Sequence, residues 1–113
     1  MSENVKEFYE KYKRDFGKMR ETMPDTVKGF QALFDATMKD GALSLKTKEL
    51  IALAIGVAVR CDPCINLHVK KCLGAGATKE EILDAVSVCA MMQGGPSFTY
   101  LPKVLDALDA NGK

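Results

Sequence analysis

The sequence predicts an all-α fold of about six helices. Three observations support this prediction: apolar residues recur at steps of three and four through most of the chain, no segment alternates as a half-buried strand does, and glycine- or proline-containing breaks separate the periodic segments. A length of 113 residues fits a single domain over residues 1–113. Within it we expect a peripheral N-terminal helix over residues 1–22 and a core over residues 24–108.

The first two predicted helices are amphipathic. Between residue 3 and about residue 20, lysines and glutamates separate apolar residues at helical spacing, which are Val5, Phe8, Tyr12, Phe16 and Met19. The segment Met23-Pro24-Asp25 interrupts this pattern. A second helix then presents an apolar face and stops at Asp40-Gly41; that face consists of Val27, Phe30, Phe34 and Met38.

The third predicted helix is apolar on every face. Ser44 can cap its N-terminus, and its body over residues 50–59 is an unbroken apolar run. Such a helix has to be buried all round. A β-strand is the rival interpretation of so many aliphatic residues, but the run is long for a strand and its alanines favour a helix.

Start signals mark the fourth and fifth helices. We expect Asp62 to cap the fourth helix and Pro63 to occupy its first turn, because an aspartate oxygen accepts free backbone N–H groups and proline has no N–H to leave unpaired. This helix should end near Gly74 or Gly76. A capping box over residues 78–81 begins the fifth helix. Its expected inner face consists of Ile82, Ala85, Val86 and Cys89.

A sixth helix follows a further break at Gly94-Gly95-Pro96. Its apolar positions are Phe98, Leu101, Leu105 and Leu108. We expect it to bend at Pro102, because proline cannot make the internal hydrogen bond.

Charge and composition narrow the possible partners. With 16 basic and 15 acidic residues spread along the chain, the sequence has no broad basic field for nucleic acid. The longest apolar run, over residues 50–59, is too short to span a bilayer, and the charged N-terminus lacks the apolar core of a signal peptide. We therefore expect no membrane association and a cytoplasmic location. Four cysteines are too few for a disulfide scaffold, so a close pair is expected to be catalytic, redox-active or metal-binding.

The most informative motif is Cys61-Asp62-Pro63-Cys64, followed by His68, the one histidine of the chain. Cys64 falls in the first turn of the expected helix, where free N–H groups and the helix dipole favour a thiolate, the reactive form. His68 lies one turn further on the same face, where imidazole can accept the thiol proton. The three-residue spacing also predicts a reversible disulfide between Cys61 and Cys64.

Simpler interpretations compete with this one. Cys72 and Cys89 lie on apolar helix faces and are expected to pack in the core. Cys61, Cys64, His68 and Cys72 have a spacing superficially like that of zinc ligands, but the last three would lie along one helix face, whereas zinc sites usually wrap a tetrahedron with a loop. A thioredoxin-like C-x-x-C is expected near a βαβ pattern, which the sequence lacks.

Glu49 completes a pattern that resembles a known family. It precedes the C-x-x-C by twelve residues, and with His68, the segment 45–53 and Gly94-Gly95-Pro96 it is similar to the carboxymuconolactone decarboxylase/AhpD-like superfamily, more narrowly to its AhpD-type alkylhydroperoxidase branch. The resemblance covers about residues 24–108. On its own, a glutamate in the first turn of a helix commonly complements the helix dipole.

The resemblance implies an AhpD-like helical fold that assembles as a homo-oligomer, a trimer or hexamer, and reduces peroxides without a cofactor or metal. Cys64 would be the peroxide-attacking thiol and Cys61 the resolving thiol, with His68 and Glu49 as a proton relay. Electrons would come from a dithiol reductant, such as a lipoyl-bearing adaptor or a thioredoxin-like protein. The sequence departs from the best-characterised AhpD-type members at Pro63, where they carry a second histidine.

Two further functions stay open: a carboxymuconolactone decarboxylase-type lyase, and a non-enzymatic oligomeric module that uses its thiols for redox sensing or metal binding. The relay also poses a geometric problem. In an ideal helical hairpin turning at Cys61, Glu49 lies about 18 Å from the turn, and His68, six residues after Asp62, lies about 9 Å from the start of the next helix. Their contact therefore requires an oblique crossing, a bend near Gly56 or a bridging water.

Overall fold

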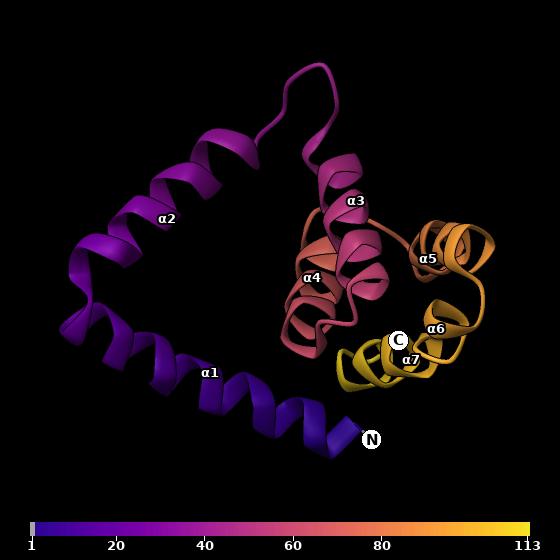
Figure 1. Ribbon diagram of the computed structural model, residues 1–113, viewed down its shortest axis with the longest axis horizontal. Coiled ribbons are helices and arrows are strands. Elements are labelled where there is room, and N and C mark those ends of the chain that lie inside the picture. The colour runs from indigo at the N-terminus through magenta and orange to yellow at the C-terminus, as the bar shows by residue number, and fades with distance from the viewer. Residues whose placement is uncertain (1) are drawn as a thin grey trace.

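The computed structural model describes residues 2–113, and side chains from Asn4 onward. This part of the chain contains seven helices and no strand, so the all-α prediction is confirmed (Figure 1). The helices are α1 (Ser2–Thr22), α2 (Pro24–Thr37), α3 (Leu45–Ala58), α4 (Asp62–Gly74), α5 (Lys79–Gln93), α6 (Gly95–Phe98) and α7 (Leu101–Ala110). Within residues 2–113, none of them has the length and apolar character that a membrane span requires.

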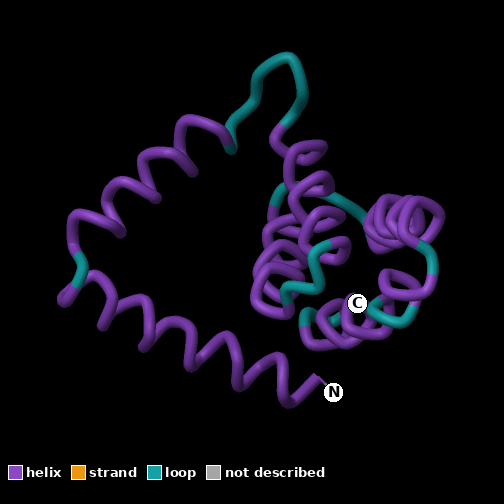
Figure 2. Tube along the Cα trace, viewed as in Figure 1, coloured by secondary structure: helices purple, strands orange, loops and turns teal. Residues whose placement is uncertain are grey.

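Helices α3 and α4 form a hairpin at the centre of the molecule. Helix α5 packs against α3, α7 packs against α4, and the single turn α6 joins α5 to α7 (Figure 1). Helices α1 and α2 extend away from this group as a two-helix arm, and the N-terminal part of α1 returns to lie beside α7 (Figures 1 and 2). The arm is therefore attached to the remaining helices mainly through α1.

The core lies between α3, α4, α5 and α7, and each helix contributes an apolar stripe to it. The largest fully buried apolar side chains are Leu53, Val57, Ile65, Val69, Ile82, Val86, Val104 and Leu108. Cys72 and Cys89 are buried in the same cluster, which confirms their predicted place in the core. Burial of this apolar surface is the main force that holds the hairpin against α5 and α7.

Helix α3 is not buried all round, and this prediction was wrong for the single chain. Ile51, Ile55 and Val59 form a stripe along one face and are 44%, 57% and 65% exposed. The reason is that α4 and α5 cover two sides of α3 while the third side faces outward. Helix α2 leaves Phe30 and Leu33 similarly exposed.

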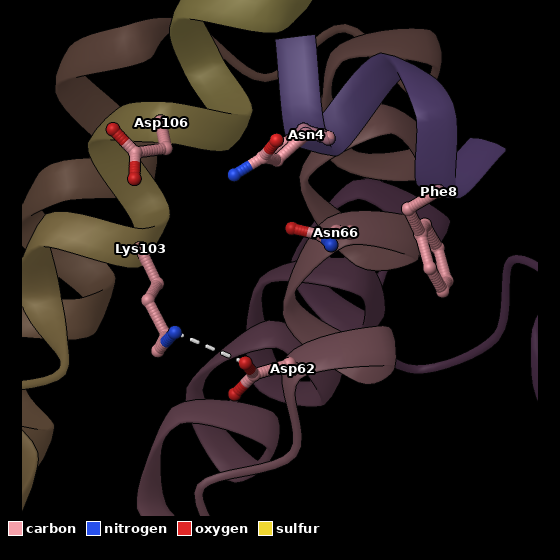
Figure 3. A pocket seen from close by; sticks show the side chains of 7 residues that line it. Asn4, Phe8, Asp62, Asn66, Lys103 and Asp106 are labelled. Atoms are coloured by element: carbon pink, nitrogen blue, oxygen red, sulfur yellow. Dashed lines mark ion pairs between the residues drawn. The ribbon is translucent and has the colours of Figure 1, made fainter. Parts of the chain in front are cut away.

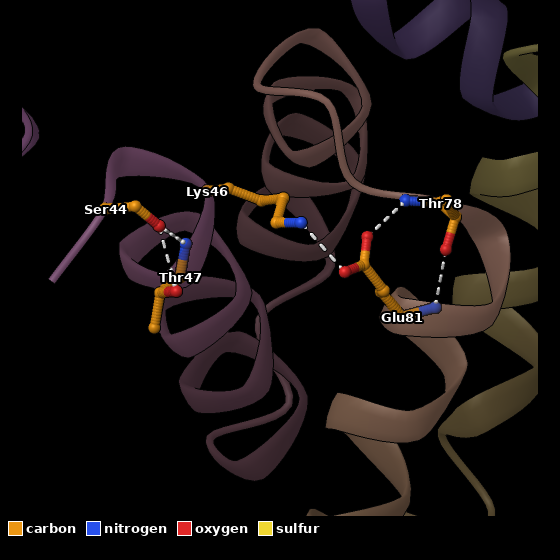
Figure 4. Close-up of polar contacts among 5 residues, drawn as sticks. All are labelled: Ser44, Lys46, Thr47, Thr78 and Glu81. Carbon is orange, nitrogen blue, oxygen red and sulfur yellow. Dashed lines mark hydrogen bonds and ion pairs between the residues drawn. The ribbon is translucent and has the colours of Figure 1, made fainter.

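Two predicted caps are confirmed (Figure 4). The hydroxyl oxygen of Ser44 accepts a hydrogen bond from the backbone N–H of Thr47 at 3.1 Å. Thr78 and Glu81 form the reciprocal capping box of α5, with contacts of 2.9 and 3.0 Å. The Glu81 carboxylate also contacts Lys46 Nζ at 2.8 Å, so the start of α5 is tied to the start of α3.

The predicted sixth helix is divided in two, so its expected course was wrong. Helix α6 ends at Phe98, and Pro102 stands in the first turn of α7 rather than at a bend. Proline is favoured in a first turn because its missing N–H has no intrahelical partner there. The inner face of α7 consists of Val104, Ala107 and Leu108, whereas Leu105 is half exposed.

Candidate active site

The α3–α4 hairpin holds every sequence-predicted site residue. Its turn is tight: Arg60 has φ of 54°, and the backbone N–H of Cys61 donates to the carbonyl of Gly56 at 2.9 Å. A Cβ placed on Gly56 would lie 3.1 Å from the Cβ of Cys64 and 3.6 Å from the backbone of α4. The absence of a side chain at Gly56 therefore lets α4 approach α3 closely beside Cys64.

Glu49 and His68 contact each other directly, Oε1 to Nδ1, at 2.7 Å. Helices α3 and α4 are in contact at Gly56 and Cys64. Glu49 lies seven residues from Gly56 along α3, or about 10.5 Å at the helical rise, and His68 lies four residues from Cys64 along α4, or about 6 Å. Their side chains span the remaining offset of about 4.5 Å. The close crossing at Gly56 thus resolves the geometric problem posed by the sequence, and no bridging water is needed.

The contact fixes the roles of the imidazole nitrogens. A carboxylate only accepts hydrogen bonds, so an ionised Glu49 requires Nδ1 of His68 to carry the hydrogen. Nε2 is then the nitrogen with a free lone pair. The Glu49 side chain is only 5% exposed, which shields the pair from competing water. A buried carboxylate that orients a histidine is a common arrangement for a general base.

Cys61 and Cys64 are joined at disulfide distance, with their Cα atoms 5.2 Å apart. Cys61 also caps α4, because its sulfur accepts the backbone N–H of Cys64 at 3.2 Å. The prediction that Asp62 is the cap was wrong: Asp62 is the first residue of the helix, and its side chain turns toward the α6–α7 corner. The helix N-terminus therefore acts on the sulfur of Cys61 as well as on Cys64.

The two remaining cysteines have environments that suppress reactivity. Burial, together with the charge of Glu49, raises the pKa of the Cys72 thiol to about 12. Burial also raises the pKa of Cys89, whose thiol donates to the carbonyl of Ala54 at 3.0 Å. Thiolates are the reactive form, so neither thiol competes with the Cys61–Cys64 pair at neutral pH.

The side chains of this region that could ligate a metal do not converge on one point. Among the described residues, no three His, Cys, Asp or Glu side chains come together as metal ligands would.

Sequence reasoning missed the residues around Asp62. Tyr100 donates its hydroxyl to Asp62 Oδ1 at 2.8 Å. Lys103 Nζ contacts Oδ2 at 3.0 Å, the ion pair that Figure 3 shows. Burial raises the pKa of Asp62, but the contacts from Tyr100 and Lys103 outweigh burial and hold that pKa below its ordinary value. The two residues lie far along the chain from Asp62, and no local pattern could have identified them.

A cavity of about 320 Å³ opens beside this cluster, between the N-terminal turns of α1 and α4 and the body of α7 (Figure 3). Its lining residues are Asn4, Val5, Phe8, Asp62, Asn66, Lys103 and Asp106. Among the described residues, the cavity lining does not include Cys61 or Cys64, nor does it include Glu49 or His68. The cavity and the hairpin site therefore lie on different sides of α4.

Comparisons with known proteins place the chain in a family. Residues 24–107 match the Carboxymuconolactone decarboxylase family. An uncharacterized protein of Cupriavidus necator is 33% identical over 110 residues, which are 97% of this chain and 97% of that protein. The crystal structure of a carboxymuconolactone decarboxylase family protein from Legionella pneumophila has a TM-score of 0.85 and 38% identity, covering 95% of this chain and 93% of that one.

A shorter match connects the chain to a named enzyme. An alkyl hydroperoxide reductase AhpD of Corynebacterium kroppenstedtii is 39% identical over 46 residues, which are 41% of this chain and 26% of that protein. The match to the family over residues 24–107 and the relative that is similar over nearly the whole length lead to the same conclusion. The chain belongs to the carboxymuconolactone decarboxylase family.

Proposed function

We propose that this protein is a thiol-dependent peroxidase of the alkylhydroperoxidase type. The observation that carries the proposal is the direct 2.7 Å contact between Glu49 and His68, one helical turn from a cysteine whose partner lies at disulfide distance. A nucleophile, a base and a group that orients the base are the parts that thiol catalysis needs. The partial similarity to an alkyl hydroperoxide reductase AhpD supports the same activity.

The proposed oxidation assigns each side chain one role. Nε2 of His68 accepts the proton of the Cys64 thiol, and Glu49 stabilises the imidazolium that results. The thiolate attacks one peroxide oxygen, the O–O bond breaks, and the alcohol leaves with a proton returned by His68. Cys64 is then a sulfenic acid. The Cys61 thiol attacks its sulfur, water leaves, and the disulfide forms.

The catalytic cycle closes when an external dithiol reduces the disulfide. The dithiol gives two electrons and two protons to the Cys61–Cys64 pair and becomes a disulfide itself. A lipoyl group on an adaptor protein or a thioredoxin-like protein has the required chemistry.

Two cysteine variants test the proposal. Cys64→Ser should abolish the first reaction with peroxide, whereas Cys61→Ser should keep one rapid oxidation and accumulate a sulfenic acid that dimedone traps. Stopped-flow oxidation of the reduced protein measures both. If Cys61→Ser were the unreactive variant, the two thiol roles would be exchanged.

The reduced protein and its two cysteine variants also distinguish a thiol peroxidase from the two alternative functions. Loss of two thiols on addition of stoichiometric peroxide, with no zinc in the purified protein, supports the thiol peroxidase over a metal-binding module. If neither cysteine variant changed the reaction with peroxide, the redox proposal would be wrong. Turnover of a carboxymuconolactone that survives both substitutions would instead identify a decarboxylase.

We also propose that the protein works as a homo-oligomer. The exposed stripe of α3 and the exposed apolar residues of α2 are accompanied by others on α5 and α6, which are Val88, Met91, Met92 and Phe98. Apolar surface of this extent is typical of an interface. A trimer or a hexamer would be in keeping with the AhpD-like resemblance.

A further inference from the structure

The side chain of Asp62, inside the C-x-x-C, is held by two residues from the α6–α7 corner. Tyr100 is the last residue before α7 and donates to one carboxylate oxygen at 2.8 Å. Lys103, in the first turn of α7, contacts the other oxygen at 3.0 Å. Each contact alone would be a modest surface interaction. Together they occupy both oxygens and fix the carboxylate in one orientation.

The position of this carboxylate gives it an electrostatic role. Asp62 follows Cys61 directly, and both stand at the start of α4. A negative charge beside a thiol disfavours the thiolate, and a positive charge favours it. The sulfur of Cys61 accepts a backbone N–H from the same turn, so the helix N-terminus favours a negative charge there, and a neighbouring carboxylate would oppose it.

The surrounding charges are few and can be named. The hydrogen bond to Asp62 raises the pKa of Tyr100, which the charge of Arg60, in the turn before α4, opposes, and the charge of Asp106 on α7 adds to the rise in the pKa of Lys103. Glu49 and His68 stand on the α3 side of α4. Lys103 is the cation in contact with the Asp62 carboxylate, and the hydrogen bond to that carboxylate raises the pKa of Lys103 itself.

We propose that Lys103 and Tyr100 are positioning residues that neutralise and orient Asp62, and thereby set how easily the Cys61–Cys64 pair is oxidised and reduced. This inference rests on the proposed thiol redox function and extends it to residues outside the relay. Stabilising a thiolate stabilises the reduced pair relative to the disulfide, which has no charge to stabilise. The α6–α7 corner therefore tunes the redox balance without touching either sulfur.

Charge variants give predictions of opposite sign. The thiol pKa of Cys61 is measured in a Cys64→Ser background from the pH dependence of iodoacetamide alkylation. Asp62→Asn should lower this pKa by about half to one pH unit, because a negative charge beside Cys61 is removed while Lys103 keeps its positive charge. Lys103→Gln should raise the Cys61 pKa by a similar amount. Combining Asp62→Asn with Lys103→Gln should bring the Cys61 pKa back close to that of the Cys64→Ser protein.

The redox balance is measured separately, with both cysteines present. Two glutathione thiols become one glutathione disulfide as the Cys61–Cys64 disulfide becomes two thiols, so the equilibrium constant follows from the reduced fraction. At a pH above the thiol pKa, Asp62→Asn should shift this equilibrium toward the reduced pair by up to about tenfold, and Lys103→Gln should shift it the other way. Tyr100→Phe leaves both charges in place and should act in the same sense as Lys103→Gln, but more weakly.

The control is Lys46→Gln, which breaks the ion pair with Glu81 at the opposite end of α3. It should change neither the thiol pKa nor the glutathione equilibrium. Shifts of one sign in both charge variants, or equal shifts in the control, would show that the loop had merely loosened and would overturn the proposal. No shift in any variant would overturn it too. Neither assay uses peroxide, so a failed peroxidase assay with intact shifts would reject the proposed function alone.

Discussion

Replacing Gly56 with alanine should force helices α3 and α4 apart beside Cys64. The new Cβ would lie 3.1 Å from the Cβ of Cys64, whereas carbon atoms in van der Waals contact are about 3.5–4.0 Å apart. The contacting atom belongs to the stem of a side chain whose sulfur is engaged with Cys61, and backbone atoms of α4 stand directly behind it at 3.6 Å. The strain therefore falls on the helix and cannot be relieved by rotating a side chain.

Two opposing contributions set the expected change in the free energy of unfolding of Gly56→Ala. Overpacking a tight contact costs about 1–3 kcal/mol, while alanine in place of glycine inside a helix gains about 1 kcal/mol. The net expectation is a loss of about 1 kcal/mol, or roughly 4 °C in Tm for a chain of this size. A shift of a few tenths of an ångström at the crossing should also disturb the Glu49–His68 contact, so the rate of peroxide oxidation should fall.

Thermal unfolding of the reduced protein at a fixed concentration measures the first effect, and stopped-flow oxidation measures the second. Gly17→Ala is the matched control, since Gly17 is also inside a helix but a Cβ placed on it would have no atom within 4 Å. Gly17→Ala should raise the free energy of unfolding by about 0.5–1 kcal/mol and leave the rate of peroxide oxidation unchanged. A Gly56→Ala variant as stable and as fast as Gly17→Ala would refute the close approach of the two helices.

Three other predictions use independent measurements. Glu49→Gln and His68→Ala should each slow oxidation at neutral pH by roughly the hundredfold typical of losing a general base, and part of the His68→Ala loss should be recovered at alkaline pH, where Cys64 ionises unaided; a pH profile of the stopped-flow rate checks both. Folding raises the pKa of Cys72 from 9.0 to about 12, so the free energy of unfolding should fall as the pH rises through that range. Chemical denaturation at several pH values measures this fall, and Cys72→Ala should make it shallower. If Cys72→Ala left the pH dependence of stability unchanged, the burial argument would be wrong. Sedimentation at micromolar concentration should show an oligomer, and a stable, well-folded monomer would exclude the proposed assembly.

Local signals in the sequence were sufficient for much of the fold. Ser44 and the Thr78–Glu81 box lie within four residues of the groups that they cap, so a short pattern contains the whole interaction. The core positions of Cys72 and Cys89 follow from helical spacing for the same reason. Predictions of this kind succeed when both partners of an interaction lie in one turn of the chain.

The errors arose where an alternative partner was far away in the sequence. Asp62 has the chemistry of a cap, but Tyr100 and Lys103 occupy its oxygens, and the sulfur of Cys61 takes the backbone N–H instead. The prediction for the last helix depended on whether Pro102 lies inside a helix or in its first turn. A shift of one or two residues in where the preceding helix ends is enough to change the answer. Composition alone does not reveal which competing hydrogen bond is made.

The relay and the thiol environment are positioned by different parts of the fold, and this separation has a kinetic consequence. The distance between α3 and α4 at Gly56 sets the geometry of Glu49 and His68, which govern how fast a proton is transferred. We propose that the α6–α7 corner acts through Asp62 on the thiol of Cys61, the resolving cysteine, and so governs how much Cys61 thiolate exists at a given pH. A variant of the first kind should slow peroxide oxidation most at neutral pH and regain part of the rate at alkaline pH, whereas one of the second kind should displace the pH profile of disulfide formation along the pH axis with its plateau preserved. Measuring both profiles on one peroxide would thus assign each substitution to proton transfer or to thiol ionisation, and a Lys103→Gln profile lowered without displacement would place that residue in the relay instead.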